Sequence, residues 1–83
     1  LGEFEEAARV FKQILKINPK YFRANLGLGI CFDKLKRQHF AVRYYKKYIA
    51  QKPNSDTTRA LVGRIVEIYS KKPDINRRLK VVS

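Results

Sequence analysis

The chain is poor in the residue types from which most catalytic and metal sites are built. It has one cysteine, one histidine and seven acidic residues in 83. Cys31 alone excludes an internal disulfide and a cysteine-rich metal site, and His39 has no second histidine with which to share a metal. No pair of carboxylates is placed for general acid and base work. These absences argue against an enzyme and predict neither a cofactor nor a metal.

Long apolar runs are missing too. No stretch of 18 apolar residues occurs, so no transmembrane segment is expected. The chain begins at Leu1 without a methionine, and we therefore expect a fragment of a longer protein. The low cysteine content fits a reducing compartment such as the cytoplasm or the nucleus.

Positive charge, in contrast, is abundant. Nineteen lysines and arginines against seven acids give a formal net charge of +12. The excess lies in residues 20–83, because residues 1–19 hold three acids and three bases. A balance of this kind predicts acidic partners: an acidic protein or peptide, or alternatively a nucleic acid or an anionic surface.

The chain aligns with itself when it is shifted by 34 residues. One register covers its whole length without an insertion. The aligned pairs include Ala7 with Ala41, Arg9 with Arg43, Phe11 with Tyr45, Pro19 with Pro53, Gly29 with Gly63, and Lys46 with Lys80. We therefore predict a repeat protein, with units at 1–21 (the second half of a first repeat), 22–55 (complete) and 56–83 (divergent and lacking its end).

Apolar residues recur at spacings of three and four, which indicates amphipathic helices. Pro19 and Pro53 end helices, because proline lacks the amide donor and clashes with the preceding turn. The predicted helices lie near residues 3–17, 20–34, 37–51, 56–70 and 73–82, and short loops make neighbouring helices antiparallel. No strand pattern competes with them.

This period and its signature residues resemble the tetratricopeptide repeat. The middle unit supplies Gly29, Phe32, Ala41, Tyr45 and Pro53, and the first supplies Gly2, Phe4, Ala7, Phe11 and Pro19. The resemblance implies an all-α fold, an α-α superhelix of antiparallel helix pairs in a solenoid. It also implies that Gly29 and Gly63 allow close helix packing, and that the module binds proteins without catalysing reactions.

The resemblance also implies an inner groove lined by the first helix of each repeat. Leu26, Ile30 and Leu61 would give this groove an apolar floor, with basic residues at its rim. The full set of candidate groove residues is Arg23, Leu26, Ile30, Lys34, Thr57, Leu61, Arg64 and Ile68.

The second helices carry a different pattern, in which basic residues recur at the 34-residue period. Stacked repeats would align them into a basic ridge on the outer face, as either a solubilising surface or a docking strip for acidic proteins or phosphates. The ridge consists of Arg9, Lys12, Arg43, Lys46, Arg77 and Lys80. The helix at 3–17 lacks the first helix of its repeat, and its uncovered apolar face is a candidate for self-association.

Overall fold

The computed structural model describes residues 2–71 and contains four helices there. They are α1 (Glu3–Ile17), α2 (Phe22–Lys34), α3 (Gln38–Gln51) and α4 (Asp56–Ser70). The first four predicted helices are confirmed, with ends that agree to within two residues. The predicted helix at 73–82 lies outside the described residues.

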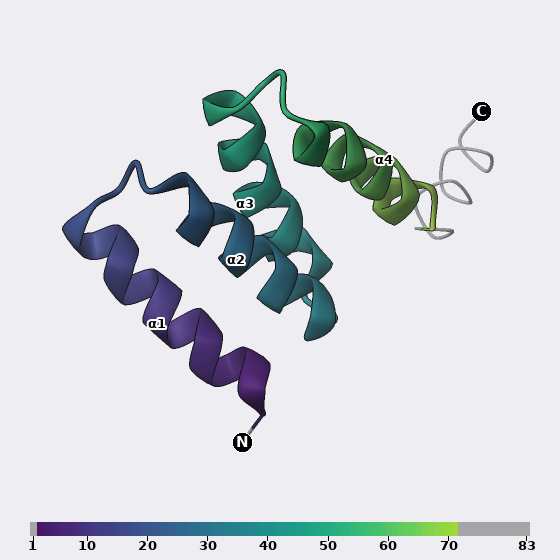
Figure 1. Ribbon diagram of the computed structural model, residues 1–83. Coiled ribbons are helices and arrows are strands. Elements are labelled where there is room, and N and C mark those ends of the chain that lie inside the picture. Colours follow the sequence, from purple (N-terminus) through teal and green to yellow (C-terminus); the bar gives the residue numbers. More distant parts are fainter. Residues whose placement is uncertain (1, 72–83) are drawn as a thin grey trace, which may run out of the picture.

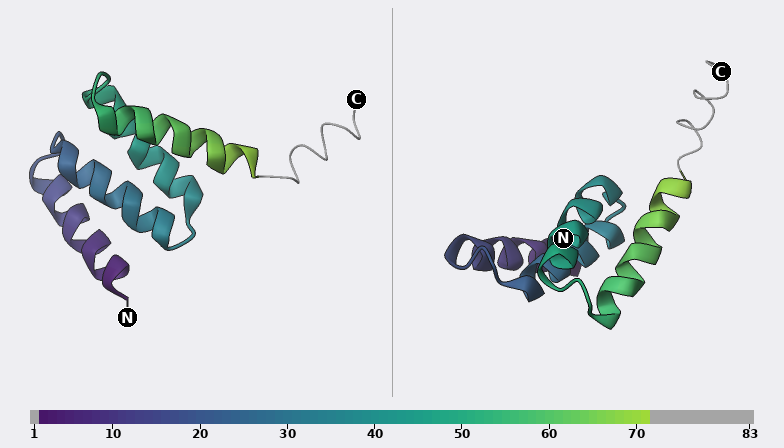
Figure 2. Two further views of the ribbon diagram at one scale, coloured as in Figure 1. Left: turned by 45° about the vertical axis from the view of Figure 1, so that its right-hand side comes forward. Right: turned by 90° about the horizontal axis from the view of Figure 1, so that it is seen from above.

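Successive helices run antiparallel and pack in chain order (Figure 1). Helix α2 lies between α1 and α3, whereas α4 packs mainly on α3 and turns away from α1 (Figure 2). The protein is therefore a stack of helices in which each helix packs mainly on the helices before and after it in the sequence. This is the all-α solenoid arrangement that the 34-residue period predicts.

The core lies where α2 meets α1 and α3. Its buried cluster contains small and large side chains in alternation: Ala8, Leu28, Cys31, Phe32, Ala41, Tyr45, Tyr48 and Leu61. Cys31 belongs to this cluster, and burial raises the pKa of its thiol. Packing of this kind supplies most of the stability of a helical repeat, because the helices themselves are short.

Glycine permits close approach at two points on α2. A β-carbon at Gly29 would lie 2.4 Å from Cδ1 of Tyr45, and one at Gly27 would lie 2.5 Å from Cζ of Phe11. The prediction for Gly29 is confirmed. For Gly63 it stays a prediction, and within residues 2–71 no atom lies within 4 Å of the same position. The helix expected to pack there falls outside the described residues.

Polar side chains fix the helix ends. Ser55 caps α4 by accepting a hydrogen bond from the Thr58 amide at 3.0 Å. The buried Asn25 donates to Oε1 of Gln51 at 3.0 Å, and Gln51 in turn donates to the Lys20 carbonyl oxygen. This chain of bonds holds the start of α2 against the end of α3.

The turn between α2 and α3 depends on one residue in a left-handed conformation, Lys36, with φ of 64°. The Arg37 amide donates to the Phe32 carbonyl oxygen at 2.8 Å, and the Lys36 amide donates to that of Asp33 at 3.1 Å. These bonds satisfy the last carbonyl groups of α2. The turn therefore fixes where the backbone of Lys36 and Arg37 lies relative to the end of α2.

Candidate functional site

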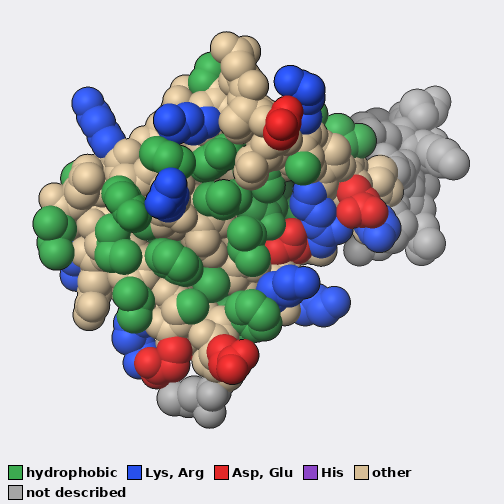
Figure 3. All heavy atoms as spheres, viewed as in Figure 1, with side chains coloured by type: hydrophobic (Ala, Val, Ile, Leu, Met, Phe, Trp, Pro, Cys, Tyr) green, Lys and Arg blue, Asp and Glu red, His purple; other side chains and the backbone are tan. Residues whose placement is uncertain are grey.

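A hollow of about 470 Å³ opens where α2, α3 and α4 meet; we call it the inner hollow. It is lined by Ile30, Asp33, Lys34, Lys36, Tyr45, Ala60, Leu61 and Arg64. Helices α2 and α4 supply most of the lining, and the α2–α3 turn adds Lys36. Figure 3 shows apolar side chains gathered over α1 and α2 on this side, with acidic and basic side chains between α2 and α4.

The inner hollow combines an apolar surface with free positive charge. Ile30 is 41% exposed although it is a large aliphatic residue, and it lies beside Ala60 and Leu61. Lys34 and Lys36 are exposed at the rim, and neither makes an ion pair within the described part of the chain. The hollow can therefore contact an apolar side chain and a carboxylate at the same time.

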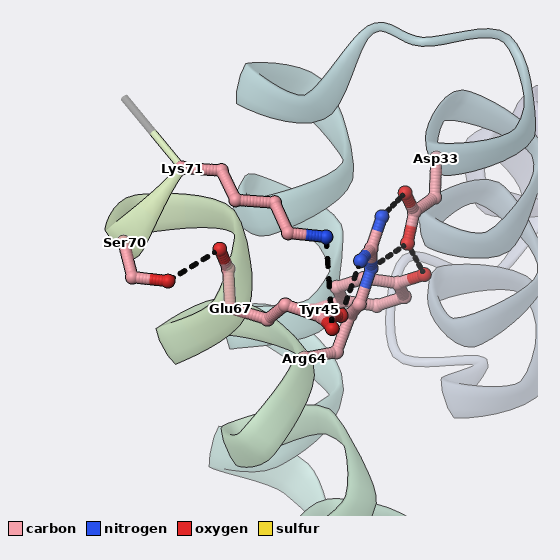
Figure 4. Close-up of polar contacts among 6 residues, drawn as sticks. All are labelled: Asp33, Tyr45, Arg64, Glu67, Ser70 and Lys71. Atoms are coloured by element: carbon pink, nitrogen blue, oxygen red, sulfur yellow. Dashed lines mark hydrogen bonds and ion pairs between the residues drawn. The ribbon is translucent and has the colours of Figure 1, made fainter. Parts of the chain in front are cut away.

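A cluster of hydrogen-bonded side chains, which we call the clasp, forms one wall of the hollow (Figure 4). Arg64 on α4 donates from Nε to Oδ2 of Asp33 at 2.8 Å and from Nη2 to Oδ1 at 2.6 Å. The Tyr45 hydroxyl donates to Oδ2 of Asp33 at 2.9 Å. Arg64 also donates to Glu67 at 2.5 Å. The clasp thus joins three helices through one carboxylate.

The electrostatics of the clasp are those of a satisfied ion pair. The Arg64 guanidinium, with help from the Tyr45 hydroxyl, holds the pKa of Asp33 below its ordinary value. Burial and the nearby Asp33 carboxylate raise the pKa of Tyr45. Hydrogen bonds to Asp33 and Glu67 raise the pKa of Arg64. Each charged group of the clasp has a partner, because Glu67 also pairs with Lys71 at 3.8 Å, so the clasp is suited to positioning helices.

Comparison with protein families matches residues 1–65 to a tetratricopeptide repeat. The chain belongs to the tetratricopeptide repeat family. Neither the curated proteins nor the solved structures contain a significant match to it. Tetratricopeptide repeats generally mediate protein–protein interactions and are typically non-catalytic scaffolds. Helices α2 and α3 pack on each other and correspond to the repeat predicted at residues 22–55. Helix α4 follows as the next helix.

The tetratricopeptide fold brings four of the eight predicted groove residues together in the inner hollow: Ile30, Lys34, Leu61 and Arg64. The other four lie outside it. Arg23 is exposed with its guanidinium 5.7 Å from the centre of the Phe22 ring, whereas Leu26 and Thr57 are half-buried. Ile68 is only 1% exposed, so it packs inside the protein and does not reach a ligand.

The role of Arg64 differs from the one that the sequence predicts. We expected a rim cation available to a partner, but its guanidinium is taken up by Asp33 and Glu67. The sequence reasoning missed Asp33, Lys36 and Tyr45 as parts of the site. One signal was available, because Asp33 and Glu67 are one period apart and Arg64 precedes Glu67 by three residues, a spacing that favours ion pairs on a helix.

Four residues of the predicted basic ridge are described, and all four are exposed: Arg9, Lys12, Arg43 and Lys46. Arg9 pairs with Glu6 at 3.2 Å, and the side chains of Lys12 and Arg43 lie over the rings of Phe32 and Phe40. Arg77 and Lys80 lie outside the described residues. Within residues 2–71, no group of three potential metal ligands occurs, and no helix is long and apolar enough to span a bilayer.

Proposed function

We propose that the chain is a non-catalytic interaction module that binds an extended protein segment in the inner hollow. The observation that carries this proposal is the exposed Ile30 beside Lys34 and Lys36, which make no ion pair within residues 2–71, in a hollow of about 470 Å³. A volume of this size lies within the range of about 300–1,000 Å³ found for ligand pockets.

The chemistry of the hollow specifies the segment. An apolar side chain would cover Ile30 and Ala60, and thereby remove exposed apolar surface from water. Carboxylates beside it would approach Lys34 and Lys36, which form no ion pair in the described part of the chain. Arg64 would contribute a fixed wall, since its hydrogen bonds to Asp33 and Glu67 hold the guanidinium in place. The preferred segment is therefore acidic and carries an apolar anchor.

We expect Ile30→Asp to weaken such binding by about tenfold or more, because it replaces the apolar anchor site with a carboxylate that repels an acidic segment and loses water when the segment binds. The measurement is fluorescence anisotropy with peptides selected from a random library against the 83-residue chain. Ile17→Asp is the matched control, since Ile17 is an exposed isoleucine far from the hollow in sequence and is 87% exposed. Equal affinities for the two variants would rule out the inner hollow.

A salt titration with duplex DNA distinguishes binding of nucleic acid from binding of a protein segment. Binding of duplex DNA through the basic ridge would fall with salt at a log–log slope near −0.9 per phosphate neutralised. The ridge residues lie away from Ile30, so Ile30→Asp would change that binding little. Sub-micromolar DNA affinity at physiological salt, lost when Arg43 and Lys46 are reversed to Glu, would replace the present proposal with the nucleic-acid function.

A further inference from the structure

A second and smaller hollow, the outer pocket, lies on the other side of α2. It has a volume of about 220 Å³ and is lined by Glu5, Ala8, Arg9, Lys12, Phe32, Leu35 and Arg37. Ile30 of the inner hollow and Phe32 of the outer pocket are two residues apart, which places them roughly 200° apart around the helix. The two hollows therefore face different directions, and the outer pocket adjoins α1 where the inner hollow adjoins α4.

The outer pocket is basic over an apolar floor. Arg9, Lys12 and Arg37 contribute three positive charges against one negative charge from Glu5. The floor consists of Phe32, Leu35 and Ala8, and Phe32 and Ala8 are each 6% exposed. Such a surface attracts a negatively charged ligand that also has an apolar part.

The three cations are available to a ligand. Arg9 makes an ion pair with Glu6, but both side chains are about 60% exposed, and pairs of this kind contribute little. Lys12 has its ammonium 5.5 Å from the centre of the Phe32 ring, directly above the floor. Arg37 forms no ion pair within residues 2–71. Its backbone amide is bonded to the Phe32 carbonyl oxygen at 2.8 Å, so the point from which its side chain extends is set before binding.

Glu5 offsets only one of these three positive charges. Its Oε1 accepts a hydrogen bond from the Gly2 amide at 2.8 Å and so serves the start of α1. The positive charge of the pocket also recurs at the 34-residue period. The positions that follow Arg9, Lys12 and Arg37 by 34 residues are Arg43, Lys46 and Lys71. The position after Glu5 is His39. The three cations thus recur, whereas the acid does not.

Size and ring packing identify the ligand class. A volume of about 220 Å³ lies below the roughly 300–1,000 Å³ of small-molecule sites and suits a single side chain of a longer partner. A nucleic-acid base would need an open ring face. Phe32 instead stacks on Tyr44 at 5.7 Å between ring centres and carries the Lys12 ammonium over its ring. The Phe32 ring therefore offers no open face to a stacked base, whereas an apolar side chain can contact the half-buried Leu35 and what remains exposed of Phe32.

We propose that the outer pocket is a second binding site, which takes an acidic peptide segment through one apolar side chain. That side chain contacts Phe32 and Leu35, and carboxylates on either side pair with Arg9, Lys12 and Arg37. The two arginines suit this role because a guanidinium binds a carboxylate through two parallel hydrogen bonds. The site does not depend on the inner hollow, since the two hollows share no residue.

The test uses the 83-residue chain and a capped peptide with one phenylalanine between acidic triplets. Its serine counterpart and a single-stranded oligothymidine serve as comparison probes. We expect Lys12→Glu and Arg37→Glu each to weaken the phenylalanine peptide by about tenfold. Lys20→Glu, which reverses an exposed charge outside both hollows, should change its affinity less than about twofold. The serine peptide should bind more weakly than the phenylalanine peptide, and Arg37→Ala should show an intermediate loss.

Several results would overturn the proposal. Equal losses for Lys12→Glu and Lys20→Glu would show attraction to net charge alone. If Ile30→Asp abolishes binding of the phenylalanine peptide and Lys12→Glu does not, the peptide binds in the inner hollow. Tighter binding of the oligothymidine than of the peptide, with the same dependence on Lys12 and Arg37, would assign the pocket to nucleic acid. Circular dichroism melts that match the parent chain show that each variant is folded.

Discussion

Replacing Gly29 with alanine is expected to destabilise the protein by about 1–3 kcal/mol, whereas the same change at Gly63 is expected to stabilise it by up to about 1 kcal/mol. The two glycines are one period apart in the sequence, yet their surroundings differ. The new β-carbon at position 29 would lie 2.4 Å from Cδ1 and 2.5 Å from Cε1 of Tyr45. The Tyr45 ring cannot move easily, since it is buried and its hydroxyl is bonded to Asp33.

At position 63 the β-carbon would meet no atom within 4 Å among the described residues. Alanine there gains helix propensity without a clash against residues 2–71, because glycine loses more backbone entropy on folding. The measurement is a urea or thermal melt of both variants, followed by circular dichroism. If both substitutions stabilise the protein equally, the close contact between α2 and Tyr45 is absent in solution.

Removing the clasp should have an effect of similar size. We expect Arg64→Ala to lower the free energy of unfolding by about 1–3 kcal/mol, because it leaves the Asp33 carboxylate without its main hydrogen-bond donor. The Asp33 side chain is only 12% exposed, so water replaces that donor incompletely. Arg59→Ala is the matched control. Its pair with Asp56 is highly exposed on both sides, and exposed pairs contribute about 0–1 kcal/mol.

The pH dependence gives a second measurement of the clasp. The pKa of Asp33 is held below its ordinary value, so the stabilisation is complete above the unfolded pKa of about 3.9. It is lost as the pH falls through the lower pKa of the folded state. The stability difference between the parent chain and Asp33→Asn should therefore be largest near neutral pH and shrink on acidification. A difference that is constant down to pH 2 would show that Asp33 does not carry the effect.

The helices could be predicted from the sequence because their signals are local. Proline positions and apolar spacing locate α1 to α4 to within two residues, and the 34-residue period predicts their order of packing. The site was harder to predict, since it depends on side chains that meet across three helices. Asp33 and Arg64 are 31 residues apart, and no local pattern shows that they form a bidentate pair.

The outer pocket could not be predicted for a different reason. Its shape depends on a backbone detail, the left-handed Lys36, which sends Arg37 back toward α1. Lysine is not a residue type that marks such a conformation, in the way that glycine or asparagine does. Periodicity located Arg9 and Lys12 on one ridge, but only the fold adds Arg37 and the aromatic floor.

The clasp also has a mechanical consequence. It ties α2 and α3 to α4, across the joint between one helix pair and the next helix, on the side that carries the inner hollow. Bending the array so that this side opens would pull Arg64 away from Asp33. The clasp should therefore resist opening of this joint, and a segment bound in the inner hollow would meet a surface of nearly fixed curvature.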